Sequence, residues 1–156
     1  MLVGNGFDIH KHSNDEKLVL GGISVKGPGF EAHSDGDIIL HSLSDALLGS
    51  KAKKDLGFYF PSDESTPKNI SSVEMLNKVL EIIEYEKVVI NNIDITVLSQ
   101  VINISKISDS IASNIANLLS VDKNLVNVKG KSFDNLGVIG EGKASACFAI
   151  VSVKDA

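Results

Sequence analysis

The sequence predicts an α+β (mixed α/β) fold, a single compact domain in which helices cover one face of a mixed β-sheet. The chain has 156 residues, a length typical of one domain. Short runs with the apolar spacing of strands are mixed along the chain with segments of helical periodicity. No internal repeat or long linker interrupts them, so we expect one domain over residues 1–156.

The first 30 residues are expected to form strands and turns. Leu2–His10 is a short mixed run, broken by two glycines, that we interpret as an edge strand. Lys17–Leu20 and Ile23–Val25 lie on either side of Gly21-Gly22 and predict a strand, a turn and a second strand. The Gly-Pro-Gly sequence at residues 27–29 then predicts a loop.

Three helices are predicted from start signals and apolar spacing. The first spans Ser34–Leu48 and starts with Ser34 and, three residues later, Asp37. The second follows a cap at Ser71 or Ser72, and apolar residues recur in it with helical spacing at Met75, Leu76, Val79, Leu80 and Ile83. The third covers Ser108–Leu119.

Three further strands and a loop complete the predicted fold. The strands are Ile93–Val97, Leu125–Gly130 and Ala144–Val153. The polar stretch Phe60–Lys68 is expected to be a mobile loop because little in it can anchor a core. Since aromatic residues are few and Ile and Val are many, we expect some strand surface to pack against other subunits.

The composition excludes several classes of protein. The 15 basic residues are all lysines, and with 20 acidic residues the formal net charge is −5, which argues against a nucleic-acid or membrane-surface binder. Cys147 has no second cysteine to pair with and reads as a small core residue. No stretch approaches the ~20 apolar residues of a membrane span, and no leader pattern opens the chain, so we expect a cytoplasmic protein.

A possible metal site combines Asp8, His10 and His41. Asp8 and His10 are two apart on a predicted strand, so their side chains project from the same face. With His41 they offer three ligands and leave one position open, as in a catalytic zinc site. Asp45 lies one helical turn after His41 and could orient its imidazole by a hydrogen bond. The alternative is that these are ordinary polar surface residues.

The segment from His33 to Asp37 marks the start of a predicted helix. Helix N-termini have free N–H groups and suit a phosphate, although Ser34 and Asp37 also fit plain capping. His12 lies between a lysine and a serine, and we expect it to be solvated.

Five motifs are spread over essentially the whole chain. They are GNGFDIH (Gly4–His10), AHSDGDIILHSLSDALLG (Ala32–Gly49), DLGFYFP (Asp55–Pro61), NIDITVLSQ (Asn92–Gln100) and VNVKG followed by LG (Val126–Gly137). In this order and spacing they resemble the 2-C-methyl-D-erythritol 2,4-cyclodiphosphate synthase family. The most specific part runs from His33 to Gly49 and contains HSDGD, the histidine at 41 and DALLG.

The resemblance implies an enzyme of the non-mevalonate pathway to isoprenoids. Such an enzyme converts 4-diphosphocytidyl-2-C-methyl-D-erythritol 2-phosphate into a cyclic diphosphate and CMP, as the 2-phosphate attacks the β-phosphorus. It also implies a homotrimer with active sites between subunits, Zn²⁺ bound by Asp8, His10 and His41, and Mg²⁺ or Mn²⁺ held mainly by substrate phosphates. His33 and Ser132 match the positions that stabilise the transition state.

The resemblance also implies a set of substrate contacts. Asp8 and His10 belong to this set. His33 and Ser34 match the residues beside the reacting phosphate. The segment that holds the methylerythritol matches Asp55, Leu56 and Gly57. The flexible substrate loop matches Phe60, Pro61, Ser62, Asp63 and Glu64. The cytidine pocket matches Ser99, Gln100, Val101, Ile102, Asn103, Ile104 and Ser105. The segment from the neighbouring subunit that grips the diphosphate matches Lys131, Ser132, Phe133 and Asp134.

The chain departs from the family pattern at several positions. Asn5 replaces a histidine that is not a metal ligand. Asn103 replaces a lysine beside the nucleotide phosphate, and Lys131 adds a cation that could offset this loss. Beside the synthase we consider two alternatives. The changes at Asn103 and Glu141 motivate the first, a diverged family member that binds metal or nucleotide with little turnover. The second is a different zinc hydrolase acting on phosphate esters.

Overall fold

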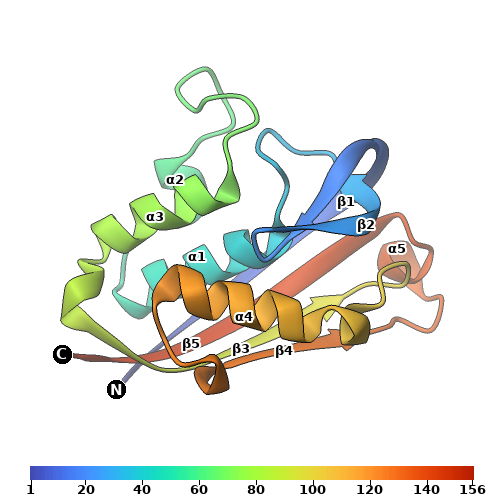
Figure 1. The fold of residues 1–156 in the computed structure, drawn as a ribbon. Helices are drawn as coiled ribbons and strands as arrows, with labels where there is room; N and C mark the ends of the chain where they lie inside the picture. Colours follow the sequence, from blue (N-terminus) through green and yellow to red (C-terminus); the bar gives the residue numbers. More distant parts are fainter.

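Five strands form one mixed sheet in the structure, a computed structural model that describes residues 1–156. The strands are β1 (Leu2–Leu20), β2 (Ile23–Phe30), β3 (Val88–Leu98), β4 (Val126–Lys131) and β5 (Ala144–Asp155). Their order is β2-β1-β5-β3-β4, and only β3 and β4 pair in parallel (Figure 1). A parallel pair needs a crossover, and α4 (Ser108–Leu119) provides it. The predicted α+β fold with a mixed sheet is confirmed.

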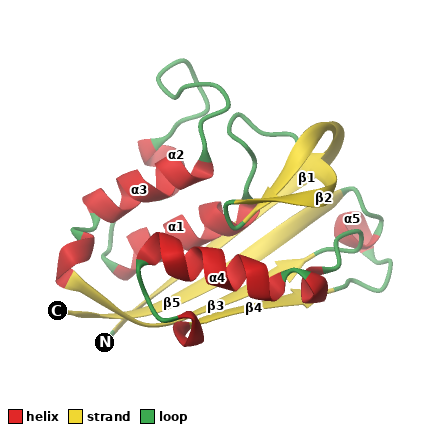
Figure 2. Cartoon of the chain, in the orientation of Figure 1, coloured by secondary structure: helices red, strands yellow, loops and turns green.

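The three long helices lie on one face of the sheet (Figures 1 and 2). They are α1 (Ile38–Ser50), α3 (Ser72–Ile82) and α4, while α2 (Leu56–Tyr59) and α5 (Gly137–Gly140) are single turns. None of the helices is both long and apolar enough to cross a membrane.

Helix α1 packs directly on β1 because two glycines allow a close approach. A Cβ atom added at Gly4 would lie 1.9 Å from the carbonyl oxygen of Ala46, and one added at Gly6 would lie 1.9 Å from that of Ser42. This contact places α1 beside the part of β1 that carries the candidate metal ligands.

Two predicted boundaries near the N-terminus are wrong. β1 does not end at His10 but continues to Leu20, pairing with β5 along its first half and with β2 along its second. The segment 27–29, predicted as a loop, belongs to β2, which is an edge strand. An edge strand tolerates Pro28, which has no N–H group, and register shifts at Lys17 accommodate the irregular pairing.

The predicted helices are present, with one corrected start. α1 begins at Ile38 rather than at Ser34, because Asp37 is its N-cap. α3 follows the predicted cap, Ser71, which forms a capping box, and α4 has the predicted bounds. Residues 60–71 contain neither helix nor strand (Figure 2); the mobility expected there stays a prediction.

The core lies between the sheet and the helices, and the opposite face of the sheet is open. Side chains of β1 and β5 alternate between these faces, as the two-residue period of strands requires. The open face presents large apolar side chains, and the rings of Phe7 and Phe148 lie 4.7 Å apart on it. The exposed apolar residues of these two strands include Val3, Phe7, Ile9, Phe148 and Ile150.

Candidate functional site

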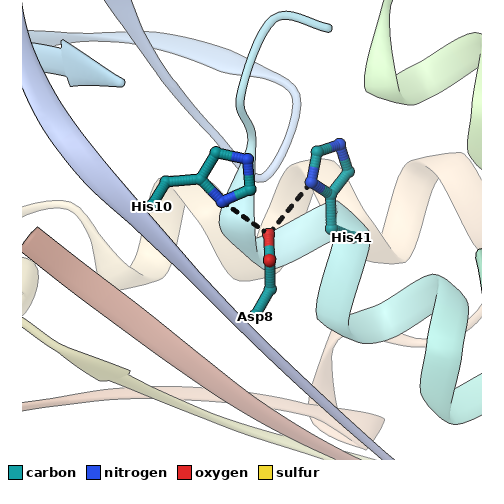
Figure 3. A group of neighbouring side chains, drawn as sticks. All are labelled: Asp8, His10 and His41. Carbon is teal, nitrogen blue, oxygen red and sulfur yellow. Dashed lines mark hydrogen bonds and ion pairs between the residues drawn. The ribbon is translucent and has the colours of Figure 1, made fainter. Parts of the chain in front are cut away.

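Asp8, His10 and His41 converge as the sequence predicts (Figure 3). Asp8 and His10 project from one face of β1, and His41 reaches them from α1. The Oδ2 atom of Asp8 lies 3.0 Å from the Nδ1 atom of His10 and 3.0 Å from the Nδ1 atom of His41. Their donor atoms all lie within 4.8 Å of one another, close enough to share one cation.

The surroundings of His10 fit a bound cation. Its Nδ1 atom is near Asp8, but the direction is not that of a hydrogen bond, so this buried nitrogen has no hydrogen-bond partner. Buried polar atoms normally have partners, and an unpaired one requires an explanation. Two imidazoles and a carboxylate are suitable ligands for a divalent transition metal, which would satisfy the unpaired nitrogen.

The charges of the three side chains depend on one another. Burial raises the pKa of the Asp8 carboxyl, but the hydrogen bond from His41 and the closeness of both imidazoles outweigh burial and lower the pKa to about 2. Burial lowers the pKa of His41, but the hydrogen bond to Asp8 and the nearby carboxylates raise it above its ordinary value. The site therefore holds an ionised carboxylate, which attracts a cation.

Serines, not Asp45, orient the imidazole of His41. Its Nε2 atom lies 3.0 Å from the hydroxyl of Ser72 and 3.2 Å from that of Ser34. The Ser72 hydroxyl donates to the carboxylate of Asp35. The hydrogen bond predicted from Asp45 is wrong, because Asp45 instead accepts from the N–H of Leu56 at the start of α2, at 2.6 Å.

The proton of Ser72 determines which nitrogen of His41 faces the cluster. The hydroxyl has a single proton, which goes to Asp35, so towards His41 it can only accept. Nε2 therefore carries a proton, and Nδ1 is the nitrogen that faces the cluster, 3.0 Å from Oδ2 of Asp8. Sequence reasoning considered Ser72 only as a helix cap, because its contact with His41 joins two helices that are far apart in the chain.

A pocket of about 230 Å³ opens beside the cluster. The predicted site residues that line it are Asp8, His10, His33, Ser34, His41, Asp45, Leu56, Gly57, Phe60 and Ser62. Thr66, Ile70 and Met75 line it too and were not predicted. Asp55, Pro61, Asp63 and Glu64 are not part of this lining.

His33 is anchored in this pocket by a backbone carbonyl. Its Nε2 atom lies 2.9 Å from the oxygen of Thr66, which can only accept, so Nε2 carries the proton. This leaves Nδ1 free of protein partners. The contact ties the segment before α1 to the loop after α2.

The residues predicted to bind the cytidine line a second pocket. It is lined by Ser99, Gln100, Val101, Ile102, Asn103, Ile104 and Ser105, together with Gly130, Lys131 and Ser132. Phe133 and Asp134 are outside the lining, although the N–H of Phe133 donates to the side chain of Gln100 at 3.2 Å. No residue lines both pockets, so the two are separate within one chain.

Two further residues have the surroundings of structural groups. Cys147 is fully buried, as predicted, and burial raises the pKa of its thiol to about 12, which keeps it protonated. The expectation for His12 is wrong: its ring is half-buried and stacks on Phe30 with 4.7 Å between ring centroids. A histidine between polar neighbours gives no sequence signal for such burial.

The fold and these pockets define a single-domain α+β protein with a candidate metal centre. The chain belongs to the YgbB family, whose model matches residues 1–154. It is 38% identical over 154 residues to the 2-C-methyl-D-erythritol 2,4-cyclodiphosphate synthase of Lachnospira eligens, covering 98% of this chain and 84% of that protein.

Solved structures agree with this assignment. An IspF from Plasmodium falciparum in complex with CDP is 38% identical, with a TM-score of 0.85 over 99% of this chain and 96% of that one. The bifunctional IspDF of Campylobacter jejuni is 34% identical with a TM-score of 0.93, over 99% of this chain and 42% of that one. The family resemblance stated from the motifs is therefore confirmed.

Proposed function

We propose that this chain is a zinc-dependent, cytoplasmic 2-C-methyl-D-erythritol 2,4-cyclodiphosphate synthase. It converts 4-diphosphocytidyl-2-C-methyl-D-erythritol 2-phosphate into 2-C-methyl-D-erythritol 2,4-cyclodiphosphate. An oxygen of the 2-phosphate forms a bond to the β-phosphorus, the bond from that phosphorus to the CMP phosphate breaks, and CMP leaves. The observation that carries the proposal is the Asp8, His10 and His41 cluster beside the pocket that holds His33 and Ser34.

Asp8, His10 and His41 would hold Zn²⁺, while Mg²⁺ or Mn²⁺ would be held mainly by the substrate's phosphates. Such cations neutralise phosphate oxygens and polarise the phosphorus under attack. Because both reacting groups are anionic, the protein must also hold them together. Folding the substrate into one orientation makes the step intramolecular, worth up to about 7–11 kcal/mol.

The remaining pocket residues bind and orient the substrate. His33 meets the reacting phosphate through Nδ1, since Nε2 is engaged by Thr66. Leu56 and Gly57 lie where the methylerythritol would sit, and Phe60 and Ser62 belong to the loop that would cover it. The second pocket takes the cytidine nucleotide, with Ser132 as the hydroxyl that stabilises the transition state.

Active sites form between the subunits of a homotrimer. Two features support this arrangement: the metal pocket and the nucleotide pocket share no lining residue, and the apolar face of β1 and β5 is open. Contact between copies would cover that face. It would also bring the metal pocket of one copy to the nucleotide pocket of its neighbour.

The reaction can be followed directly by ³¹P NMR. We would incubate the protein with 4-diphosphocytidyl-2-C-methyl-D-erythritol 2-phosphate, Zn²⁺ and Mg²⁺, and expect the cyclic diphosphate to appear together with CMP. Intact substrate in the presence of a zinc-loaded protein would overturn the proposal in favour of a diverged family member that binds without turnover. Hydrolysis to acyclic phosphates would instead indicate a different zinc hydrolase.

Loss of the Ser72 hydroxyl is expected to weaken zinc binding. Ser72→Ala removes the acceptor that keeps Nδ1 of His41 facing the cluster, and such supporting groups typically contribute about 10–100-fold in metal affinity. Competition with a chromophoric chelator measures this change. Ser71→Ala is the matched control, because it removes a neighbouring hydroxyl that caps α3 without contacting His41. Equal zinc affinity of Ser72→Ala and the wild type would contradict the assigned role.

Lys131 is expected to replace the lysine that the family has at position 103. It lies at the end of β4 and lines the nucleotide pocket together with Asn103. Lys131→Thr should therefore raise KM about tenfold, the effect of losing one charge-assisted hydrogen bond, with little change in kcat. Lys106→Thr is the comparison, since Lys106 lines a different cavity. An unchanged KM for Lys131→Thr would contradict the compensation.

A further inference from the structure

A chain of hydrogen bonds leads from β2 through His12 to the nucleotide pocket. The Nδ1 atom of His12 lies 3.3 Å from the carbonyl oxygen of Pro28 and 3.2 Å from that of Gly29. Its Nε2 atom lies 2.8 Å from the hydroxyl of Ser145, which in turn lies 2.8 Å from the hydroxyl of Ser99. Ser145 is fully buried and Ser99 is buried, so these groups have few alternative partners.

The hydrogen bonds of this chain connect His12 to Ser99 in two steps. The two carbonyl oxygens of β2 only accept, so Nδ1 of His12 carries a proton and donates to them. The hydroxyl of Ser145 contacts Nε2 of His12 on one side and donates to the hydroxyl of Ser99 on the other. Ser145 therefore links the imidazole to Ser99.

The hydroxyl of Ser99 connects this chain of hydrogen bonds to the wall of the nucleotide pocket. Its hydroxyl oxygen accepts from the N–H of Val101 at 3.3 Å and from the N–H of Ile102 at 3.1 Å. These bonds form the turn with which the segment Ser99–Ser105 leaves β3 and lines the pocket. A different χ1 rotamer of Ser99 would move its oxygen away from both N–H groups, and the turn would lose these two bonds.

His12 itself is held firmly enough to serve as the fixed end. Its ring stacks on Phe30 with an interplanar angle of 25°, and its backbone N–H donates to the carbonyl of Lys143 at 2.9 Å. The ring is thus held by an aromatic contact on its face and by hydrogen bonds on both nitrogens.

We propose that His12 and Ser145 are positioning residues for nucleotide binding: through Ser99 they preorganise the segment Ser99–Ser105 for a cytidine nucleotide. This inference rests on the proposed function for the identity of the ligand. Preorganised loops bind more tightly because less freedom is lost when the ligand arrives. Neither residue lines the nucleotide pocket or the metal pocket.

The test uses full-length zinc-loaded protein and CDP as the probe, with calorimetry to measure Kd. His12→Phe keeps an aromatic ring for Phe30 and removes both hydrogen bonds, and Ser145→Ala removes the middle hydroxyl. Each should raise the Kd for CDP about fivefold to tenfold, as expected for one lost hydrogen bond. In turnover, KM should rise while kcat changes little. His12→Gln, whose amide can both donate and accept, should restore most of the affinity.

A second readout separates this inference from the proposed function. In the free protein, the amide NMR signals of Val101 and Ile102 should shift in His12→Phe and in Ser145→Ala, but not in Ser13→Ala, a change of the neighbouring serine outside the chain of bonds. Unmoved signals, or a wild-type Kd in both variants, would overturn the positioning role. If the signals shift but the wild type does not bind CDP, the proposed function fails instead, and the nucleotide role of His12 fails with it.

Discussion

Asp8→Asn is expected to lower kcat/KM by about 10³-fold or more, because the variant loses the charged ligand at the centre of the candidate metal site. The carboxylate is the one acidic member of the cluster, and its Oδ2 atom is 3.0 Å from the nearest nitrogen of each histidine. Asparagine has the same shape but no charge, so the two imidazoles would bind a cation without a compensating anion. Zinc competition and the ³¹P assay measure both consequences.

The matched control for Asp8→Asn is Asp15→Asn, an exposed acid on the same strand with no contact to the cluster. It should keep both zinc affinity and turnover near the wild-type values. If Asp8→Asn kept full turnover and bound zinc as tightly as the wild type, the cluster could not be the metal centre. A loss of zinc without a loss of turnover would separate the metal from the reaction.

The parts of the fold that were predictable are those with a local cause. Helix α4 has the predicted bounds because apolar residues recur along one face, and α3 begins after Ser71 because Ser71 and Glu74 form a capping box. The segment 27–29 was mispredicted because Gly and Pro signal a turn locally. Its extended conformation comes from pairing with β1, which the local sequence does not contain.

The three residues of the metal cluster could be predicted from the sequence, but the side chains that orient His41 could not. Asp8 and His10 are two apart on a strand, a spacing that by itself puts both side chains on one face. The contact of Ser72 with His41 depends instead on how α3 packs beside α1. Asp45 has the right helical spacing from His41, but its carboxylate is used by the start of α2, a helix that no sequence signal indicated.

His12 shows the same limit at the second pocket. The pairs His12–Ser145 and Ser145–Ser99 join β1, β5 and the end of β3, which are neighbours only after the sheet has formed. Local sequence suggests a solvated side chain, because Lys11 and Ser13 are polar. The burial of His12 depends on the order of the strands. That order brings together residues more than 40 positions apart in the chain.

Asp37→Asn is expected to reduce the free energy of unfolding by about 2 kcal/mol, the cost of leaving a backbone donor at this buried site without an acceptor. The carboxylate is fully buried and accepts four backbone N–H groups. Two of them begin α1, and the other two, from Gly21 and Gly22, form the turn between β1 and β2. An asparagine can accept on one side only, so its NH₂ group would face a backbone N–H without an acceptor.

Denaturant unfolding at fixed protein concentration measures the change in Asp37→Asn, and Asp109→Asn is its control. Asp109 lies in the first turn of α4 but is exposed, so its substitution should alter stability by no more than about 0.5 kcal/mol. Wild-type stability of Asp37→Asn would mean that the N–H of Gly22 finds another partner. The cap of α1 should remain, because one side-chain oxygen accepts from both Ile39 and Leu40 and asparagine keeps an oxygen there. Since α1 carries His41, zinc binding should change little in Asp37→Asn, whereas Asp8→Asn weakens it.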